Sequence, residues 1–174
     1  KMSFQCIKGS AELSYALLEL TAEFAKKYSE LKKERNVLDF NDLEHMALQV
    51  LYKEDAEGNL IPSELADELA MSLKEIMIDE YQDSNYVQEA IINALSAVRF
   101  GRHDVFTVGD VKQSIYRFRN ARPELFNRRY ETFSDDEAYD DVRIELNANY
   151  RSRKEVIDSV NTVFLKIMSK EAAG

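Results

Sequence analysis

The 174-residue sequence has one cysteine, two prolines, five glycines and no tryptophan, and these scarcities narrow what the chain can be. Because Cys6 stands alone, no disulfide can form within the chain, which agrees with a reducing, cytoplasmic setting. The low proline and glycine content favours a helix-rich structure. No apolar run approaches the roughly 20 residues that span a bilayer, so neither a membrane segment nor a signal peptide is predicted.

The formal net charge is -9 at pH 7, and hydrophobic residues make up 45% and charged residues 32% of the sequence. This composition predicts a folded globular protein and argues against a uniformly basic nucleic-acid-binding domain. The charges are unevenly placed, because basic side chains gather in 112–122 and acidic ones in 134–141. Local contact with nucleic acid is therefore compatible with the negative total.

Apolar residues recur at spacings of three and four through 11–35, which predicts a long amphipathic helix packed on a neighbouring domain. A second amphipathic helix is expected to follow, with Asp39 or Asn41 as its N-cap. Capping boxes, in which the first and fourth residues bond each other's backbone, are predicted at 85–88 and 152–155. The shorter helices are predicted over 40–52, 62–73, 85–98, 122–133 and 152–167, and 53–61 is predicted to be a polar loop.

Three short apolar segments are predicted to be strands, at 76–78, 105–108 and 142–146. They alternate with helices, which indicates an α/β fold with a parallel sheet. Ligands bind beyond the carboxyl ends of strands in such sheets, so the residues that follow each segment are the candidate site.

Two carboxylates follow the first strand. Neighbouring residues at the end of an extended strand point in different directions, so Asp79 and Glu80 can have different chemical roles. Asp79 could hold Mg²⁺, and Glu80 could accept a proton from a water that attacks a γ-phosphate. The alternative is an acidic turn after a strand.

The second strand leads into Gly109 and a run of mixed basic and aromatic residues. Gly109 lets the backbone turn close to a ligand, and the Gln113 amide could touch both a phosphate oxygen and a water. Tyr116, Phe118 and Arg119 have the chemistry of a platform for single-stranded nucleic acid, with rings for bases and guanidinium groups for phosphates. The alternative is an amphipathic loop whose rings belong to the core.

The third strand leads into Tyr150 and Arg151. Tyr150 could stack on a purine ring, and Arg151 could reach a γ-phosphate as an arginine finger does. The alternative is a helix N-terminus that carries a surface arginine.

The segments 78–88, 108–126 and 146–161 resemble motifs II, III and IV of the UvrD-like superfamily 1 DNA helicases, and 38–48 resembles a stretch just before motif II. Within this superfamily, the amino-acid sequence of 108–126 is most similar to AddA, the family of helicase/nuclease A subunits. The resemblance implies an α/β, partial RecA-like P-loop NTPase core with parallel strands and an added helical segment.

The resemblance also implies a role for each matching residue in binding ATP, Mg²⁺ and DNA. Asp79 matches the Mg²⁺ ligand, Glu80 the base, Gln113 the γ-phosphate sensor and Arg151 the γ-phosphate arginine. Tyr150 matches the residue that stacks on adenine, and Gln82 and Asp83 match positions tying the metal site to neighbouring motifs. Tyr116, Phe118 and Arg119 match positions that link the nucleotide site to the DNA strand.

The expected organisation is a helical segment from an inserted subdomain (1–37), part of the first RecA-like domain (38–133), an acidic linker (134–141) and the start of the second RecA-like domain (142–174). No P-loop pattern is present, so we expect an internal piece that does not hydrolyse ATP alone. The resemblance implies a parent that is a 3′ to 5′ DNA helicase/nuclease subunit, processing double-strand DNA ends for recombination repair beside an AddB-like partner.

Two other functions fit parts of the sequence. A non-catalytic helicase remnant that only binds DNA or a partner would explain the absent P-loop, but would not need Glu80, Gln113 and Arg151. A two-metal hydrolase using Asp79, Glu80 and Asp83 would leave the second and third motifs unexplained.

Overall fold

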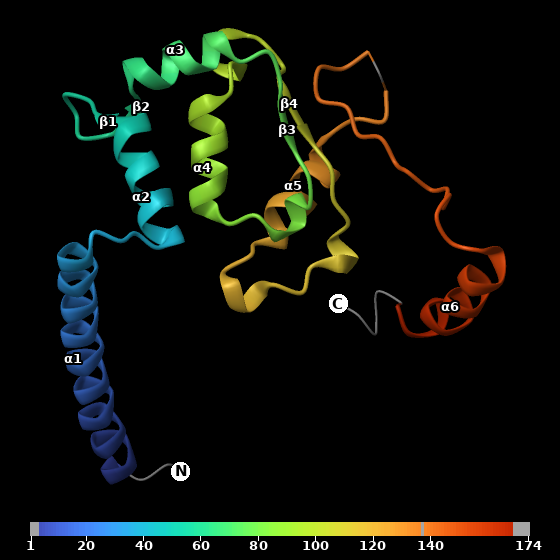
Figure 1. Ribbon diagram of the computed structural model, residues 1–174. Helices are drawn as coiled ribbons and strands as arrows, with labels where there is room; N and C mark the ends of the chain where they lie inside the picture. The colour runs from blue at the N-terminus through green and yellow to red at the C-terminus, as the bar shows by residue number, and fades with distance from the viewer. Residues whose placement is uncertain (1–3, 137, 169–174) are drawn as a thin grey trace. The chain divides into compact units, whose positions relative to one another are not determined.

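The computed structural model describes residues 4–136 and 138–168 and separates into two compact units, one ending at Glu131 and one beginning at Thr132. Unit 1 holds helices α1 to α4, the four described strands and most of α5, and unit 2 holds α6 (Figure 1). Each unit is described by itself. None of the described helices combines the length and apolar character that crossing a bilayer requires.

Helix α1 (Phe4–Arg35) is the long helix predicted over 11–35 from the apolar spacing, and it begins seven residues earlier than predicted. It ends in a Schellman motif, because Asn36 takes a left-handed conformation (φ 50°) and the Val37 amide donates to the Lys32 carbonyl at 3.1 Å. The expected neighbour for its apolar stripe is not among the described residues of unit 1. The stripe side chains are instead 43–66% exposed: Leu13, Leu17, Leu20, Phe24, Tyr28 and Leu31.

Helix α2 (Phe40–Leu51) begins at Asp39, one of the two predicted caps, which forms a capping box with Asp42. The Lys32 ammonium of α1 donates to Asp39 at 2.9 Å and to Asp42 at 2.6 Å, and lies 4.7 Å from the ring centre of Tyr28. The hydrogen bond from Lys32, followed by that from the Asp42 amide, lowers the pKa of Asp39 to about 2. One cation thus holds the end of α1 against the beginning of α2.

The core of unit 1 lies between three helices. Helix α2 packs on α3 (Glu64–Ser72) and α4 (Tyr86–Leu95), as Figure 1 shows, and Leu51, Ala66 and Ala94 meet there. The segment 53–61, predicted to be a loop, is instead part of a small antiparallel hairpin of β1 (Tyr52–Glu54) and β2 (Leu60–Pro62). Its turn places Gly58 at φ 82°, which glycine adopts at no steric cost.

Strands β3 (Ile76–Ile78) and β4 (Val105–Thr107) pair in parallel, with Met77 opposite Phe106, and lie side by side in Figure 1. The first two predicted strands and their parallel arrangement are therefore confirmed. The predicted capping box that starts α4 is confirmed as well, because Asn85 and Gln88 bond each other's backbone amides. Short 3₁₀ turns connect these elements: η1 (Tyr81–Asp83), η2 (Val98–Phe100), η3 (Val111–Gln113) and η4 (Arg117–Arg119), after which α5 spans Pro123–Thr132.

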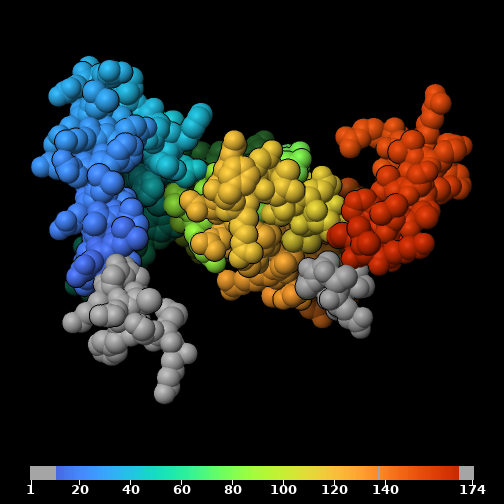
Figure 2. Space-filling view, turned by 90° about the horizontal axis from the view of Figure 1, so that it is seen from below, coloured from blue at the N-terminus to red at the C-terminus, as the bar shows by residue number. Residues whose placement is uncertain are grey.

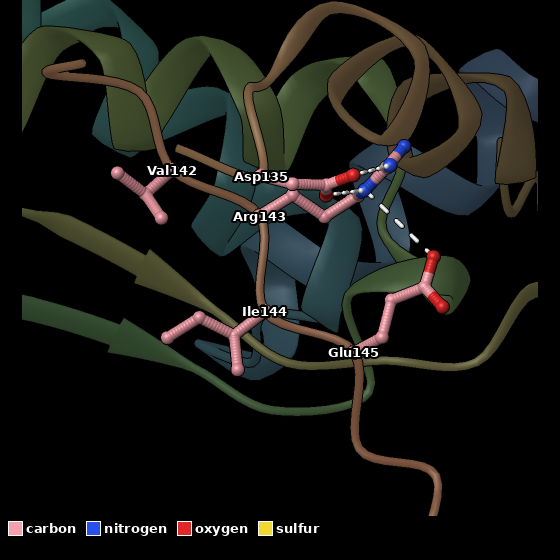
Figure 3. A pocket seen from close by; sticks show the side chains of 5 residues that line it. All are labelled: Asp135, Val142, Arg143, Ile144 and Glu145. Carbon is pink, nitrogen blue, oxygen red and sulfur yellow. Dashed lines mark hydrogen bonds and ion pairs between the residues drawn. The ribbon is translucent and has the colours of Figure 1, made fainter. Parts of the chain in front are cut away.

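In unit 2 the predicted third strand at 142–146 is wrong. This segment makes one isolated bridge between Ser134 and Val142, because no other described strand pairs with it. The Arg143 guanidinium donates to both oxygens of Asp135 at 2.8 Å and closes the acidic loop. Figure 3 shows the shallow pocket beside this pair, which holds none of the predicted site residues and is lined by Asp135, Val142, Arg143, Ile144 and Glu145.

Helix α6 (Lys154–Ile167) has the predicted type but not the predicted cap. Its N-cap residue is Arg153, and no side chain caps it. Asn149 accepts from the Ser152 amide at 2.9 Å instead, so the predicted capping box at 152–155 is wrong. A hydroxyl at Ser152 stands one position too early to cap this helix.

We expect Lys32→Met to raise the pKa of Asp39 from about 2 toward its ordinary value, because the largest cause of the shift is removed. A depressed carboxyl pKa stabilises the fold above the unfolded-state pKa, and this contribution is lost as pH falls through the folded value, here between about pH 4 and about pH 2. Titration of the Asp39 carboxyl carbon by NMR measures the shift. Lys27→Met, which removes an exposed pair with Glu23 on the same helix, is the matched control; an unchanged Asp39 pKa in Lys32→Met contradicts the assignment.

Candidate functional site

The parallel pairing of β3 and β4 continues past the strand ends and sets the backbone of the candidate site. The Val108 amide donates to the Ile78 carbonyl at 2.8 Å, and the Tyr81 amide donates to the Val108 carbonyl at 2.9 Å. Glu80, between these two bonds, has φ 49° and ψ 39°, a left-handed conformation that costs an L-residue roughly 1–2 kcal/mol. Asp79 holds this turn by accepting from the Glu80 amide at 2.9 Å.

Gln82 connects the two strand ends from a buried position, with only 1% of its surface exposed. Its amide nitrogen donates to Glu80 Oε2 at 2.6 Å, and its amide oxygen accepts from the Asp110 backbone at 3.0 Å. A carboxylate only accepts and a backbone N–H only donates, so a primary amide is the side-chain group that satisfies both neighbours at once.

Asp110 extends this connection to Gln113. Its carboxylate caps η3 by accepting from the Lys112 amide at 3.0 Å, and it accepts from the Gln113 side chain at 3.2 Å. Burial acts to raise the pKa of Asp110, but the hydrogen bonds from Gln113 and Lys112 outweigh it, and the pKa lies below its ordinary value. Hydrogen bonds thus connect Glu80 to Gln82, Gln82 to the Asp110 backbone, and the Asp110 carboxylate to Gln113, and we call these four residues the relay.

Gly109 is required where the relay crosses from one loop to the other. A Cβ at this position would lie 2.5 Å from Gln82 Oε1 and 3.0 Å from the Phe126 ring. Both distances are shorter than ordinary contacts, so only glycine allows Gln82 and Phe126 to approach the strand end as closely as they do. The sequence prediction that Gly109 serves a close approach concerned a ligand; here the approaching groups belong to the protein.

Two carboxylates near the relay have oxygen atoms to offer a hard cation. Asp79 is exposed, and one oxygen of Asp83 is buried with no hydrogen-bond partner. Burial, and then the negative charge of Glu80, raises the pKa of Asp83. Carboxylate oxygens with open positions fit Mg²⁺, which prefers a few protein oxygens and completes its shell with water or phosphate. Among the side chains that the structure describes, in 11–136 and 138–168, no three His, Cys, Asp or Glu form a ready metal cluster.

The predicted DNA residues lie together on an exposed loop. Tyr116 and Phe118 are 39% and 77% exposed, with ring centres 6.0 Å apart, and the Arg119 guanidinium lies 5.4 Å and 5.6 Å from them. In Figure 2 the stretch that contains them (yellow) lies at the surface of unit 1 on the side turned to the viewer. The alternative of aromatics buried in the core does not describe these rings. We call Tyr116, Phe118 and Arg119 the platform.

Tyr150 and Arg151 lie in unit 2. Tyr150 is 96% exposed, and the Asn149 side chain accepts from the Arg151 amide at 3.0 Å, which shapes the turn before α6. Both side chains face solvent within their own unit. Their predicted contacts to a nucleotide stay predictions.

Comparison with known proteins identifies the family. Residues 5–134, which include the relay and the platform, match the UvrD/REP helicase N-terminal domain. The chain belongs to this family. The resemblance drawn from the motifs at 78–88 and 108–126 is therefore confirmed.

The relatives are long proteins, each an A subunit of an ATP-dependent helicase/nuclease. The chain is 52% identical over 158 residues to the one from Lachnoclostridium phytofermentans, covering 91% of this chain and 11% of that protein. Those of Clostridium beijerinckii and Acetivibrio thermocellus are 49% identical over 164 residues and 50% over 156, covering 94% and 90% of this chain and 13% and 12% of those proteins. This UvrD/REP family chain thus spans about an eighth of the length of these relatives.

Sequence reasoning did not find Asp110 as a member of the site. The signal for it was present, because Asp110 stands between Gly109 and Gln113 in the second motif and directly after a strand. Its hydrogen bond to Gln113 spans three positions in a 3₁₀ turn, a distance that local sequence could have indicated. The bond from Gln82 to the Asp110 backbone spans 28 positions and needed the fold.

We expect Gly109→Ala to destabilise the chain by about 1–3 kcal/mol, because the new methyl group must displace Gln82 or Phe126. In a Gln82→Ala background the nearest clash is gone, so the same substitution should cost less, with a coupling of about 0.5–3 kcal/mol between the two sites. Urea unfolding of the four members of this double-mutant cycle measures the difference. Strictly additive effects would show that Gly109 and Gln82 do not contact each other.

Proposed function

We propose that this chain is part of the ATP-driven motor of a DNA helicase/nuclease of the AddA type, with its hydrolytic and sensing residues in 38–133. The observation that carries the proposal is the relay, which joins Glu80 to Gln113 across two adjacent parallel strand ends within the region that matches the UvrD/REP domain. Strand ends of this kind are where α/β folds bind nucleotides. Residues 1–37 are then the end of an inserted helical subdomain, and 142–174 begin a second RecA-like domain after the acidic linker.

The relay residues have distinct parts in ATP hydrolysis. Glu80 is exposed and held by Gln82 at 2.6 Å, so its other oxygen is free of that bond and can take a proton from an attacking water. The Gln113 carbonyl oxygen is left to orient that water, because the Asp110 bond uses only its nitrogen. Asp79 would hold Mg²⁺, which when bound neutralises phosphate charge.

The platform and unit 2 complete the motor. Tyr116 and Phe118 offer faces to successive bases of a single strand, and Arg119 supports a phosphate. In the parent protein, Tyr150 would stack on adenine and Arg151 would contact the γ-phosphate. The parent moves 3′ to 5′ and processes double-strand DNA ends in the cytoplasm beside a second, AddB-like protein. The names of the relatives support the ATP-dependent helicase/nuclease part of this proposal.

In the full-length protein that carries this chain, Glu80→Gln should lower DNA-stimulated ATP hydrolysis by about 10²–10⁴-fold while leaving ATP binding in place. Glutamine still accepts the bond from Gln82 but cannot take a proton from water. Phosphate release measured with saturating single-stranded DNA gives the rate. Glu75→Gln, an exposed substitution of the same chemistry before β3, is the control, and a wild-type rate in Glu80→Gln would refute the assignment of the base.

Phe118→Ala in the same protein should weaken single-stranded DNA binding by about 5–150-fold, the effect of losing one base stack of about 1–3 kcal/mol. Phe118→Trp should keep the affinity, because the stacking face is retained. Fluorescence anisotropy of a labelled oligothymidylate at fixed salt measures both. Phe100→Ala removes a phenylalanine that is 50% exposed and also faces an arginine, Arg99, but lies outside the platform. Equal losses in Phe118→Ala and Phe100→Ala would argue against a specific platform.

A further inference from the structure

Tyr81, the residue after Glu80, is held in place by contacts with helices α4 and α5. Its side chain is fully buried, and its hydroxyl donates to Glu89 Oε2 on α4 at 2.5 Å. The Arg129 guanidinium of α5 lies 4.4 Å from the Tyr81 ring centre and donates to Glu89 at 3.1 Å. Each of the three residues thus contacts the other two, and we call them the triangle.

The triangle helps to fix the backbone conformation of Glu80 and therefore the direction of its side chain. The left-handed backbone of Glu80 is unfavourable for a glutamate, so it persists only because its surroundings hold it. On one side Asp79 accepts from the Glu80 amide, and on the other the Tyr81 amide is bonded to Val108. The Tyr81 side chain adds the third restraint, because a fully buried ring with a bonded hydroxyl cannot rotate freely. A shift of Tyr81 would be passed to Glu80 through one peptide bond.

Helix α5 contacts both strand-end loops through one face. Phe126 and Arg129 are three positions apart and therefore neighbours on the helix. The Phe126 ring lies 6.4 Å from the Tyr81 ring and is the same ring that abuts Gly109. Arg129 and Glu89 are 19% and 18% exposed, so water screens their ion pair less than it screens a surface pair. The loop of Glu80 and the loop of Gln113 both rest on this helix.

The chain also leads directly from the platform into α5. Asn120 ends η4 in a left-handed conformation (φ 65°), and the Arg122 amide then donates to the Ser84 carbonyl at 2.8 Å, just beyond the Glu80 turn. Pro123 begins α5 one residue later. The segment between the platform and α5 is therefore short, and the hydrogen bond from Arg122 fixes it to Ser84. The platform and the start of α5 are thus restrained from moving independently.

We propose that Tyr81, Glu89 and Arg129 are positioning residues that transmit occupancy of the platform to Glu80 through α5. This inference rests on the proposed function. A single strand of DNA bound on Tyr116 and Phe118 shifts or stiffens the start of α5. Arg129 transmits that change to Tyr81, and Tyr81 transmits it to the backbone of Glu80, the general base. The planar guanidinium suits this task because it stacks on the ring and bonds the carboxylate at the same time.

The test uses the full-length protein that carries this chain, with ATP hydrolysis measured with and without single-stranded DNA. Tyr81→Phe removes only the hydroxyl, and Arg129→Met removes the stacked charge but keeps much of the bulk. In both, the ratio of DNA-stimulated to unstimulated rate should fall by about tenfold through kcat, with KM for ATP unchanged, because small misplacement of a catalytic group is costly. Arg129→Lys should restore part of the ratio, since it keeps the charge beside Glu89.

Arg128→Met, an exposed arginine one position away, is the matched control and should leave the ratio as in wild type. A purely structural triangle would lower both rates in the same proportion, following the folded fraction, and this result overturns the inference. If Arg129→Met fails to fold, Tyr81→Phe decides, because the ring and its packing remain. Loss of all DNA-stimulated hydrolysis already in wild type would instead refute the proposed function itself.

Discussion

The candidate site depends on two backbone hydrogen bonds that continue the parallel ladder beyond β3 and β4. The Val108 amide bonds Ile78, and its carbonyl accepts from Tyr81, so the two chains stay in register while they leave the sheet. This pairing brings Gln82 within reach of the Asp110 amide, although 28 positions separate them. A shift of one residue in the register would turn each side chain to the opposite face and break the relay. The strands are only three residues long, yet they decide which side chains meet.

Helices and caps that depend on interactions between nearby residues were predictable from the sequence. Strands that depend on pairing with another segment were harder to predict. Helix α2 and the Asn85 capping box depend on residues within four positions of each other and were predicted correctly. Asp39 was one of two predicted caps, and α1 was predicted from residue 11 but begins at Phe4. The alternating pattern at 142–146 was misleading, because alternation gives a segment the faces of a strand but not the neighbour that a strand must bond. The hairpin at 52–62 was missed because its residues are mostly polar and show no strand pattern. The turn at Gly58 nevertheless brings its two short strands together, so that they pair.

The same division separates the parts of the site. The motif residues Asp79, Glu80 and Gln113 could be proposed from their order after strands. The relay between them could not, because Gln82 acquires its role only when Asp110 is placed against it. Glu89 and Arg129 gave no signal at all, since a glutamate and an arginine on separate amphipathic helices are ordinarily solvated. What distinguishes them is the buried Tyr81 ring between them, and burial of a single tyrosine cannot be read from a sequence in which nine occur.

The net charge of -9 does not describe the charge of the surface around the platform. Arg119 lies against two rings rather than a carboxylate, so among the described residues its charge is supported but not neutralised. Lys112 and Arg117 do have acidic neighbours, at 3.4 Å and 4.0 Å, but the side chains of both cations are well exposed, so solvent and salt weaken these pairs. The acidic run at 134–141 is partly satisfied within unit 2 by Arg143. Because salt limits the range over which each charge acts, a loop in which one arginine lies against two aromatic rings can attract a phosphate backbone even when the whole chain is acidic.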